Sequence, residues 1–318
     1  MSNNISYEDY VKILSSEIEK SSERGLSVMK VTKNNNTMLD AVVLEGMNIA
    51  PVAYIHDFYE AFKSGKAIHE IIEDIMLIVS NVPESVKEIV AKMDDYKEAS
   101  KYILPAIINY EKNQEYLKKV VHRRFLDLAV VYKIAFDVDD GVRGVLTIPN
   151  FELEQWCVTE EELYKKAIEN ARKKDEFSAV PIMELCYDIL SHNGVHTEEE
   201  ARLYEASKDT SDKNFIVLSS DSRQGGASVL LFTDIFKNAL EKYYPDSKKL
   251  LILPSSIQEV IAMPYPDDEE SIKFLKEMVR EVNETVVAEE EVLSDDSLYF
   301  YDVETDKIGI VEMLKEDI

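Results

Sequence analysis

The sequence contains few of the residues that break, cross-link or anchor a chain. Only 9 glycines and 9 prolines occur among 318 residues, which favours long regular helices and strands. No apolar run approaches the roughly 18 residues that a membrane-spanning helix needs. The amino terminus shows neither the basic nor the apolar part of a secretion signal. We therefore expect a cytoplasmic protein that does not span a membrane.

Positive charge is scarce. The chain has 36 Lys and Arg residues and 62 Asp and Glu residues, which gives a formal net charge of −26. Such a surface repels nucleic-acid phosphates and anionic lipids, so we expect no direct binding to nucleic acid. It suits a partner protein with a basic surface. Residues 264–318 hold 18 acidic and 5 basic residues, a net of −13, which indicates either solubility or mimicry of nucleic acid.

Few metal-binding or redox-active residues are present. The two cysteines, Cys157 and Cys186, suit a reducing compartment, and their mixed apolar surroundings predict small core residues. His192 and His196 are four residues apart, but the intervening Asn-Gly would break a helix. We expect neither a metal nor a cofactor.

Hydrophobic residues make up 45% of the chain, enough for a folded core. Helical spacing predicts helices near residues 7–18 and 68–79, from 159, and at 233–243 and 272–282. Alternating or apolar runs predict strands at 26–32, 38–44, 51–55, 102–109, 125–136, 142–148, 214–218, 227–231, 249–253, 258–263, 298–302 and 308–311. Hairpins and helices are interleaved, so the fold class is α+β, with mixed or antiparallel sheets, packed helices and two lobes. We place the lobes at residues 1–175 and 214–318, joined by a connecting segment at 176–213.

The clearest candidate site is a cationic segment, residues 112–133, with seven potential cations in 22 residues. Within it, Arg123 and Arg124 could hold an anion by bidentate contacts. His122 could act as an acid or base, with Asp127 as its orienting group. The alternative is an internal network of salt bridges. On a strand, Arg123 and Asp127 would share a face, and Asp127 would then need a buried partner.

A second candidate is the loop that contains Ser255 and Ser256, either of which could be a nucleophile. The glycine-flanked elbow of serine hydrolases is absent, which favours a turn with hydroxyls bound to the backbone. The pair Gly225-Gly226 resembles a phosphate-binding loop only loosely, and a hairpin turn is favoured there.

Five ordered motifs carry a family resemblance: residues 108–113, 121–129, 156–164, 253–260 and 282–295. Together they resemble an uncharacterised family of gut anaerobic Firmicutes, domain of unknown function 5688. The resemblance covers most of the chain and implies a bacterial, intracellular setting linked to mobile elements. The family pattern has His where this chain has Gln258, which weakens a catalytic role for that loop. No activity comes with the family.

No catalytic or cofactor motif is complete. We therefore expect a non-enzymatic protein-binding or regulatory module. One alternative is a hydrolase or phosphate-handling enzyme that uses His122, Arg123, Arg124 and Asp127, with Ser255 or Ser256 as nucleophile. The other is an acidic nucleic-acid mimic that inhibits a nuclease through residues such as Glu289, Glu290 and Glu291.

Overall fold

The computed structural model describes most of the chain, and all structural statements here concern that part. The described ranges are 5–20, 25–45, 51–80, 87–88, 90–138, 142–174, 177–192, 215–220 and 224–312. Their contacts form two compact units, Met1–Asp95 with Phe136–Gly144, and Tyr96–Ala135 with Val145–Ile318. Within these ranges every helix is too short or too polar to cross a lipid bilayer. The boundary expected at residues 176–213 stays a prediction.

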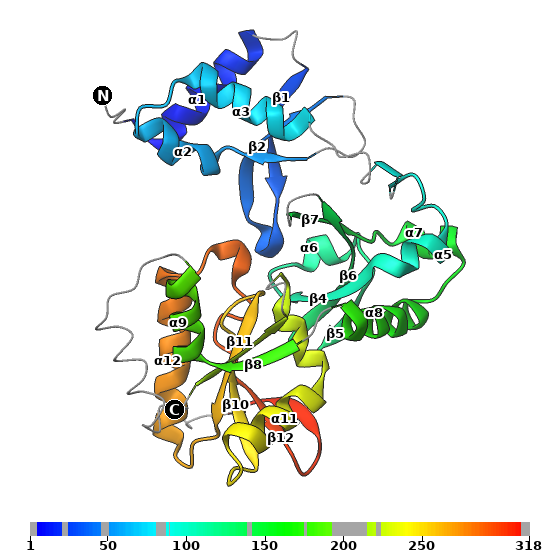
Figure 1. The fold of residues 1–318 in the computed structure, drawn as a ribbon, viewed down its shortest axis with the longest axis vertical. Helices are drawn as coiled ribbons and strands as arrows, with labels where there is room; N and C mark the ends of the chain where they lie inside the picture. The colour runs from blue at the N-terminus through cyan, green and yellow to red at the C-terminus, as the bar shows by residue number, and fades with distance from the viewer. Residues whose placement is uncertain are drawn as a thin grey trace. The chain divides into compact units, whose positions relative to one another are not determined.

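The first unit packs three helices against a three-stranded antiparallel sheet (Figure 1). Its elements are α1 (Tyr7–Lys20), β1 (Leu26–Thr32), η2 (Asn34–Asn36), β2 (Met38–Leu44), β3 (Ala53–Tyr54), α2 (His56–Lys63) and α3 (Ile68–Ser80). Asn35 and Asn36 turn the β1–β2 hairpin with φ of 60° and 62°. Asparagine tolerates this left-handed backbone better than most residues. The predicted hairpin is confirmed.

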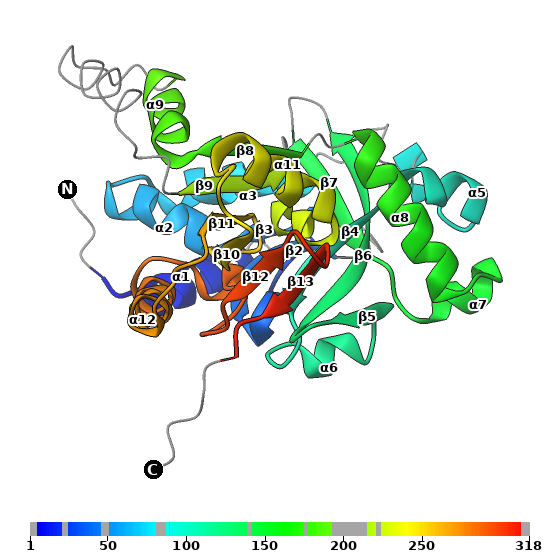
Figure 2. The same ribbon diagram turned by 90° about the horizontal axis from the view of Figure 1, so that it is seen from below.

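The second unit holds most of two further antiparallel sheets, and the first of these has the order β4–β6–β5, with β7 paired to β6. Its elements are α5 (Tyr96–Ala99), η3 (Ser100–Tyr102), β4 (Ile103–Asn109), α6 (Gln114–Leu117), β5 (His122–Phe125), β6 (Leu128–Val138), β7 (Val142–Thr147), α7 (Phe151–Trp156) and α8 (Glu160–Lys174). The end of β6 and the start of β7 fall within Phe136–Gly144 and so belong to the first unit. Figure 2 shows α8 alongside β4 and β6. Asn170 of α8 donates hydrogen bonds to the carbonyls of Ser100 (2.7 Å) and Ile103 (2.9 Å), which fixes the helix to this sheet.

The other sheet of the second unit has six strands in the order β13–β12–β10–β11–β9–β8. Its elements are β8 (Phe177–Pro181), α9 (Ile182–His192), β9 (Ile216–Ser220), η5 (Gly226–Leu231), α11 (Thr233–Tyr243), β10 (Lys249–Leu253), β11 (Glu259–Pro264), α12 (Glu269–Thr285), η6 (Glu289–Glu291), β12 (Tyr299–Asp302) and β13 (Lys307–Ile310). Every pair of neighbouring strands in this sheet is antiparallel. The protein is therefore α+β, as predicted.

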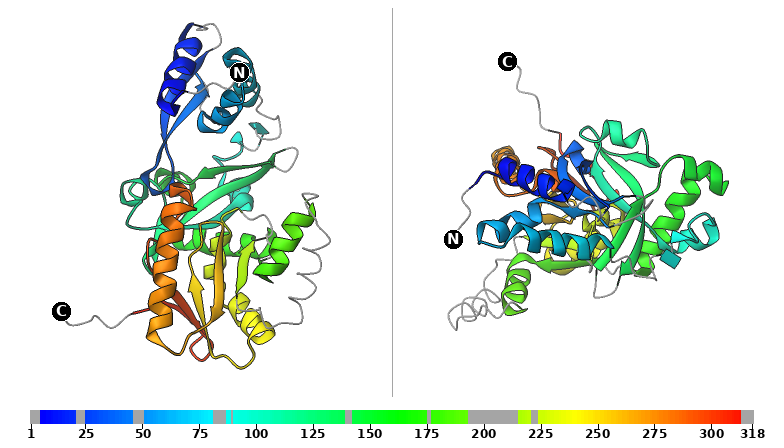
Figure 3. Two further views of the ribbon diagram at one scale, coloured as in Figure 1. Left: turned by 90° about the vertical axis from the view of Figure 1, so that its left-hand side faces the viewer. Right: turned by 90° about the horizontal axis from the view of Figure 1, so that it is seen from above.

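Helices cover both faces of the six-stranded sheet. The buried residues Ile272, Leu275 and Val279 of α12 pack on Leu251 and Leu253 of β10. The ring of Phe236 in α11 meets that of Tyr301, which is paired with Leu250 and so lies on the opposite face. Figure 3 shows α12 (orange) running along one side of the strands.

The strand β8 forms one edge of this sheet, and its open side is partly occupied. The Tyr243 hydroxyl of α11 donates a hydrogen bond of 2.9 Å to the carbonyl of Ala179. Pro181 ends the strand and has no N–H to donate. The edge thus presents fewer free backbone groups than its length implies.

Three local predictions are wrong. Residues 227–231 form a 3₁₀ helix rather than a strand, because Gly225 turns the chain with φ 67° and Gly226 lies against β9 and the β10–β11 loop. The hairpin turn predicted at Gly225-Gly226 is also wrong, because a 3₁₀ helix and not a strand follows Gly225. Cys157 and Cys186 are free and exposed rather than core residues. Cys157 ends α7 in a left-handed conformation with φ 54°, so helix termination explains its position.

Candidate functional site

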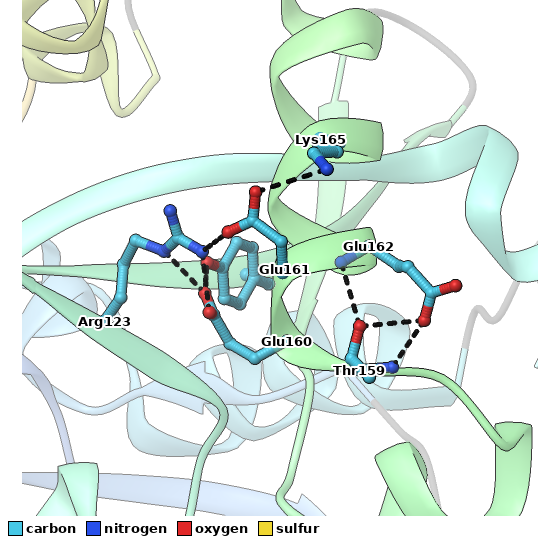
Figure 4. Close-up of polar contacts among 7 residues, drawn as sticks. Arg123, Thr159, Glu160, Glu161, Glu162 and Lys165 are labelled. Atoms are coloured by element: carbon cyan, nitrogen blue, oxygen red, sulfur yellow. Dashed lines mark hydrogen bonds and ion pairs between the residues drawn. The ribbon is translucent and has the colours of Figure 1, made fainter.

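Arg123 is tied to the first turn of α8. Its Nε and Nη2 atoms each donate a hydrogen bond of 2.7 Å to Glu160, one to each carboxylate oxygen (Figure 4). Nη2 also donates one of 2.6 Å to Glu161. The side chains of Arg123 and Glu160 are each 28% exposed. This fork-like geometry is the strong form of an arginine–carboxylate pair.

Aromatic rings complete the surroundings of Arg123. Its guanidinium carbon lies 3.8 Å from the ring centre of Tyr164, a cation–π contact. The hydroxyl of Tyr132 donates a hydrogen bond to Glu160. The bond to Glu160 raises the pKa of Arg123, and burial together with that carboxylate raises the pKa of Tyr132. Arg123 is therefore a neutralised structural cation.

The start of α8 explains why these carboxylates stand there. Thr159 donates to Glu162 through its N–H and its hydroxyl, both at 2.8 Å, and the Glu162 N–H returns a 3.3 Å bond to the Thr159 hydroxyl. This reciprocal capping box fixes the first turn (Figure 4). Hydrogen bonds from Thr159 lower the pKa of Glu162, and the bond from Arg123 lowers that of Glu161. Ionised glutamates also suit the positive end of a helix dipole.

His122 and Arg124 lie on the opposite face of β5. They pair with Val131 and Ala129, whereas Arg123 pairs with Val130, and side chains alternate along a strand. The Nδ1 atom of His122 hydrogen-bonds the carbonyl of Val120 at 3.0 Å. Arg124 donates 3.1 Å to the carbonyl of Leu126 and stacks over Tyr110 at 4.5 Å. The two arginines thus cannot clamp one anion together.

Asp127 lies in the tight turn between β5 and β6, not on the strand face shared with Arg123. Leu126 before it has φ 57°, which is unusual for a bulky residue and marks the turn. The buried Tyr299 of β12 donates a hydrogen bond of 2.8 Å to the Asp127 carboxylate. Burial and this carboxylate raise the pKa of Tyr299. Asp127 therefore links the two sheets of the second unit and does not orient His122.

Ser255 and Ser256 lie in the loop between β10 and β11. The Ser255 hydroxyl donates a long 3.4 Å hydrogen bond to Glu259, and the Ser256 hydroxyl accepts one of 3.0 Å from the Gln258 N–H. The side chain of Gln258 in turn joins Gly225 (2.8 Å) and Glu291 (3.2 Å). The loop matches the predicted turn in which hydroxyls satisfy the backbone.

Glu259 also borders a small pocket of about 140 Å³. Three serines of β8 and β9, Ser178, Ser219 and Ser220, line the same pocket. In the described part of the chain, no hydrogen bond or ion pair joins His122 to Asp127, Ser255 or Ser256. The residues proposed for catalysis are thus distributed over separate local networks.

The described ranges hold no group of three or more His, Cys, Asp and Glu side chains placed to bind a metal. His196 lies outside the described residues. The expectations of no metal and no cofactor stay predictions.

Residues 7–303 match the model of a family of unknown function, DUF5688. The chain belongs to DUF5688. This match confirms the resemblance seen in the sequence and extends it over both units. No curated protein and no solved structure matches this DUF5688 chain. The gut-Firmicutes origin stays a prediction.

Sequence reasoning missed the partners that decide the role of the basic cluster in this DUF5688 protein. The helix predicted from residue 159 has Glu160 and Glu161 in its first turn, but no local pattern in the sequence links them to Arg123. Tyr299 lies 172 residues from Asp127 in sequence, and no local pattern links them. The sequence did contain one usable signal. Side chains alternate along a strand, so Arg123 is expected to point away from His122 and Arg124.

Proposed function

We propose that the protein is a non-catalytic binding protein that recognises another protein through an acidic surface. The observation that carries this proposal is an imbalance in pairing. Arg123 is neutralised by Glu160 and Glu161. By contrast, Glu270, Glu277, Glu281 and Glu284 are exposed on α12 and make no ion pair with any described residue.

Unpaired glutamates on one helix repel one another. Like charges at i,i+4, such as Glu277 and Glu281, each destabilise a helix by about 0.2–0.5 kcal/mol. A partner with lysines or arginines would relieve this repulsion, and the net charge of −26 would speed the encounter. A protein with a basic surface is thus the partner class that this charge distribution supports.

The test is affinity capture from cells that encode the protein, at near-physiological salt, followed by reconstitution with the purified partner. We expect a complex of fixed stoichiometry whose affinity falls as salt rises, because exposed charges are screened. Failure to reconstitute a complex with any captured protein would refute the binding function. The bacterial setting and the link with mobile elements stay predictions of the family resemblance.

An enzyme is the second candidate, favoured by one observation: Glu259 accepts the Ser255 hydrogen bond and borders the 140 Å³ pocket. A serine next to a carboxylate and a pocket is a minimal arrangement for a nucleophile. p-Nitrophenyl acetate and p-nitrophenyl phosphate would serve as probes. Turnover lost in both Ser255→Ala and Glu259→Gln would establish this alternative, and turnover unchanged in both would remove it.

His122 provides an independent check on the same alternative. If His122 is an acid or base, His122→Ala abolishes that turnover, whereas an unchanged rate removes the histidine from the reaction. The mimic alternative predicts that charge reversal of Glu289 and Glu290 abolishes inhibition of a basic nuclease. Glu291, which accepts a hydrogen bond from Gln258, is reversed together with these two residues.

A further inference from the structure

The helix α12 exposes a row of apolar side chains to solvent. Phe274, Met278 and Val282 follow one another at i,i+4 spacing, so they lie above one another on one side of the helix. Phe274 is 65% exposed and Val282 is 38% exposed. Met278 packs partly on the core below. Val286, one helical turn further and just beyond the helix, is 76% exposed. The exposed apolar row therefore adjoins the buried face of α12 and extends the apolar surface of the helix toward solvent.

A row of carboxylates runs beside the apolar row. Glu270, Glu277, Glu281 and Glu284 recur at i, i+7, i+11 and i+14, which keeps them on one flank of a helix with about 3.6 residues per turn. All four side chains are exposed.

The helix also carries three cations, Lys273, Lys276 and Arg280. Lys276 and Arg280 pair with Asp296 at 3.3 Å and 3.4 Å. Asp296 therefore engages these two cations. Lys273 and Arg280 lie within one turn of Glu277, but the four glutamates of the row form no ion pair with a described residue.

The apolar row and the glutamate row together form a surface that favours a partner with both apolar and positively charged side chains. An exposed phenylalanine gains on burial, since about 25 cal/mol is recovered for each Å² of apolar surface removed from water. The glutamates gain from nearby cations in the same step. From Phe274 to Val286 the row spans roughly 18 Å at 1.5 Å per residue. A helix of about three turns matches this length.

We propose that α12 docks a basic amphipathic helix of a partner protein. Apolar residues of the partner at i,i+4 spacing lie against Phe274, Met278 and Val282, and lysines or arginines on one flank contact the glutamate row. This assignment rests on the proposed binding function and gives that function a surface and a partner class.

The experiment uses the full-length protein and a fluorescent synthetic helix of leucine and lysine, with leucines at i,i+4 spacing. Binding is followed by fluorescence anisotropy. Phe274→Ala is expected to weaken binding about tenfold, as for a central apolar anchor. Its matched control is Phe151→Ala, since Phe151 is similarly exposed at 62% and is expected to change affinity little.

Charge reversal gives the second arm. Glu281→Lys is expected to weaken binding about tenfold and to reduce its salt dependence. The new lysine follows Glu277 by four residues, the favourable order for a helical ion pair. The melting temperature should therefore hold or rise, which separates lost binding from unfolding. Glu241→Lys on α11 makes the same change in net charge and serves as the control.

Three results would overturn the assignment: no binding of the peptide by the wild-type protein, equal weakening in the controls, or Phe274-dependent binding to phosphatidylserine vesicles. Binding of the natural partner distinguishes a failure of this inference from a failure of the proposed binding function on which it rests. A captured partner that binds the wild type and both α12 variants equally leaves the binding function intact and removes this surface. A partner lost from both variants, but not from the controls, supports both.

Discussion

Arg123 and Glu160 join β5 to α8 through two parallel hydrogen bonds of 2.7 Å, across 37 residues of sequence. Tyr132, Tyr164 and Glu161 contact the same two groups, so the pair is part of a larger packed network. Its geometry leads directly to a first prediction.

Arg123→Met should lower the free energy of unfolding by about 1–2 kcal/mol. The change leaves Glu160 partly buried without its cation, although its partial exposure moderates the loss. Denaturant unfolding followed by circular dichroism measures the effect. Arg124→Met is the matched control, and because Arg124 is exposed and carries no ion pair with a described residue, we expect a change within about 0.5 kcal/mol. Equal losses in the two variants would contradict the structural role of Arg123.

Acid should weaken the start of α8. The pKa values of Glu161 and Glu162 are lowered below the ordinary value of 4.5 by hydrogen bonds from Arg123 and Thr159. A carboxylate with a lowered folded-state pKa contributes stability above pH 4.5, and this contribution disappears as pH falls through the folded pKa. Unfolding measured between pH 7 and about pH 3 should show this loss. Glu162→Gln should give a flatter curve, and parallel curves would speak against the capping contribution.

Gly226→Ala should disrupt the second unit more than Gly225→Ala. A Cβ at Gly226 would lie 2.2 Å from the Gln258 carbonyl oxygen and from the Ser219 hydroxyl oxygen. At Gly225 there is room, and only the backbone φ of 67° opposes a side chain. We expect a loss of about 3 kcal/mol or more at Gly226 and about 1 kcal/mol at Gly225. Thermal unfolding compares the stabilities of the two variants. A larger loss for Gly225→Ala than for Gly226→Ala would contradict the tight packing around Gly226.

Tyr299→Phe should cost about 1–2 kcal/mol of unfolding free energy, because Asp127 loses its buried hydroxyl donor. Tyr265→Phe is the control, since the Tyr265 hydroxyl makes no hydrogen bond with a described residue. If both substitutions cost the same, the link between the two sheets contributes nothing measurable.

Periodicity predicted most of the elements because it reports which side of an element is buried. The strands 26–32, 38–44 and 249–253 match β1, β2 and β10 residue for residue. The helix near residues 68–79 buries its predicted apolar positions, Ile71, Ile75 and Val79. Antiparallel pairing was among the expected arrangements and is the one observed.

The sequence could not show what depends on packing between distant segments. Four of the five residues 227–231 are apolar, so their period does not distinguish a strand from a 3₁₀ helix, and the tight contact of Gly226 decides between them. Likewise the basic cluster predicted nearby anions, and Glu160 and Glu161 supply them for Arg123. Which of the adjacent cations would be neutralised depended on the register of β5 with β6.

The occupied side of β8 has a consequence for how the protein behaves in a crowded solution. A second copy that tried to extend the sheet there would meet a carbonyl at Ala179 already bound by Tyr243, and no donor at Pro181. Strand-by-strand growth into fibres is thereby discouraged at this end. The β8 edge is therefore a poor template for pairing with a second copy.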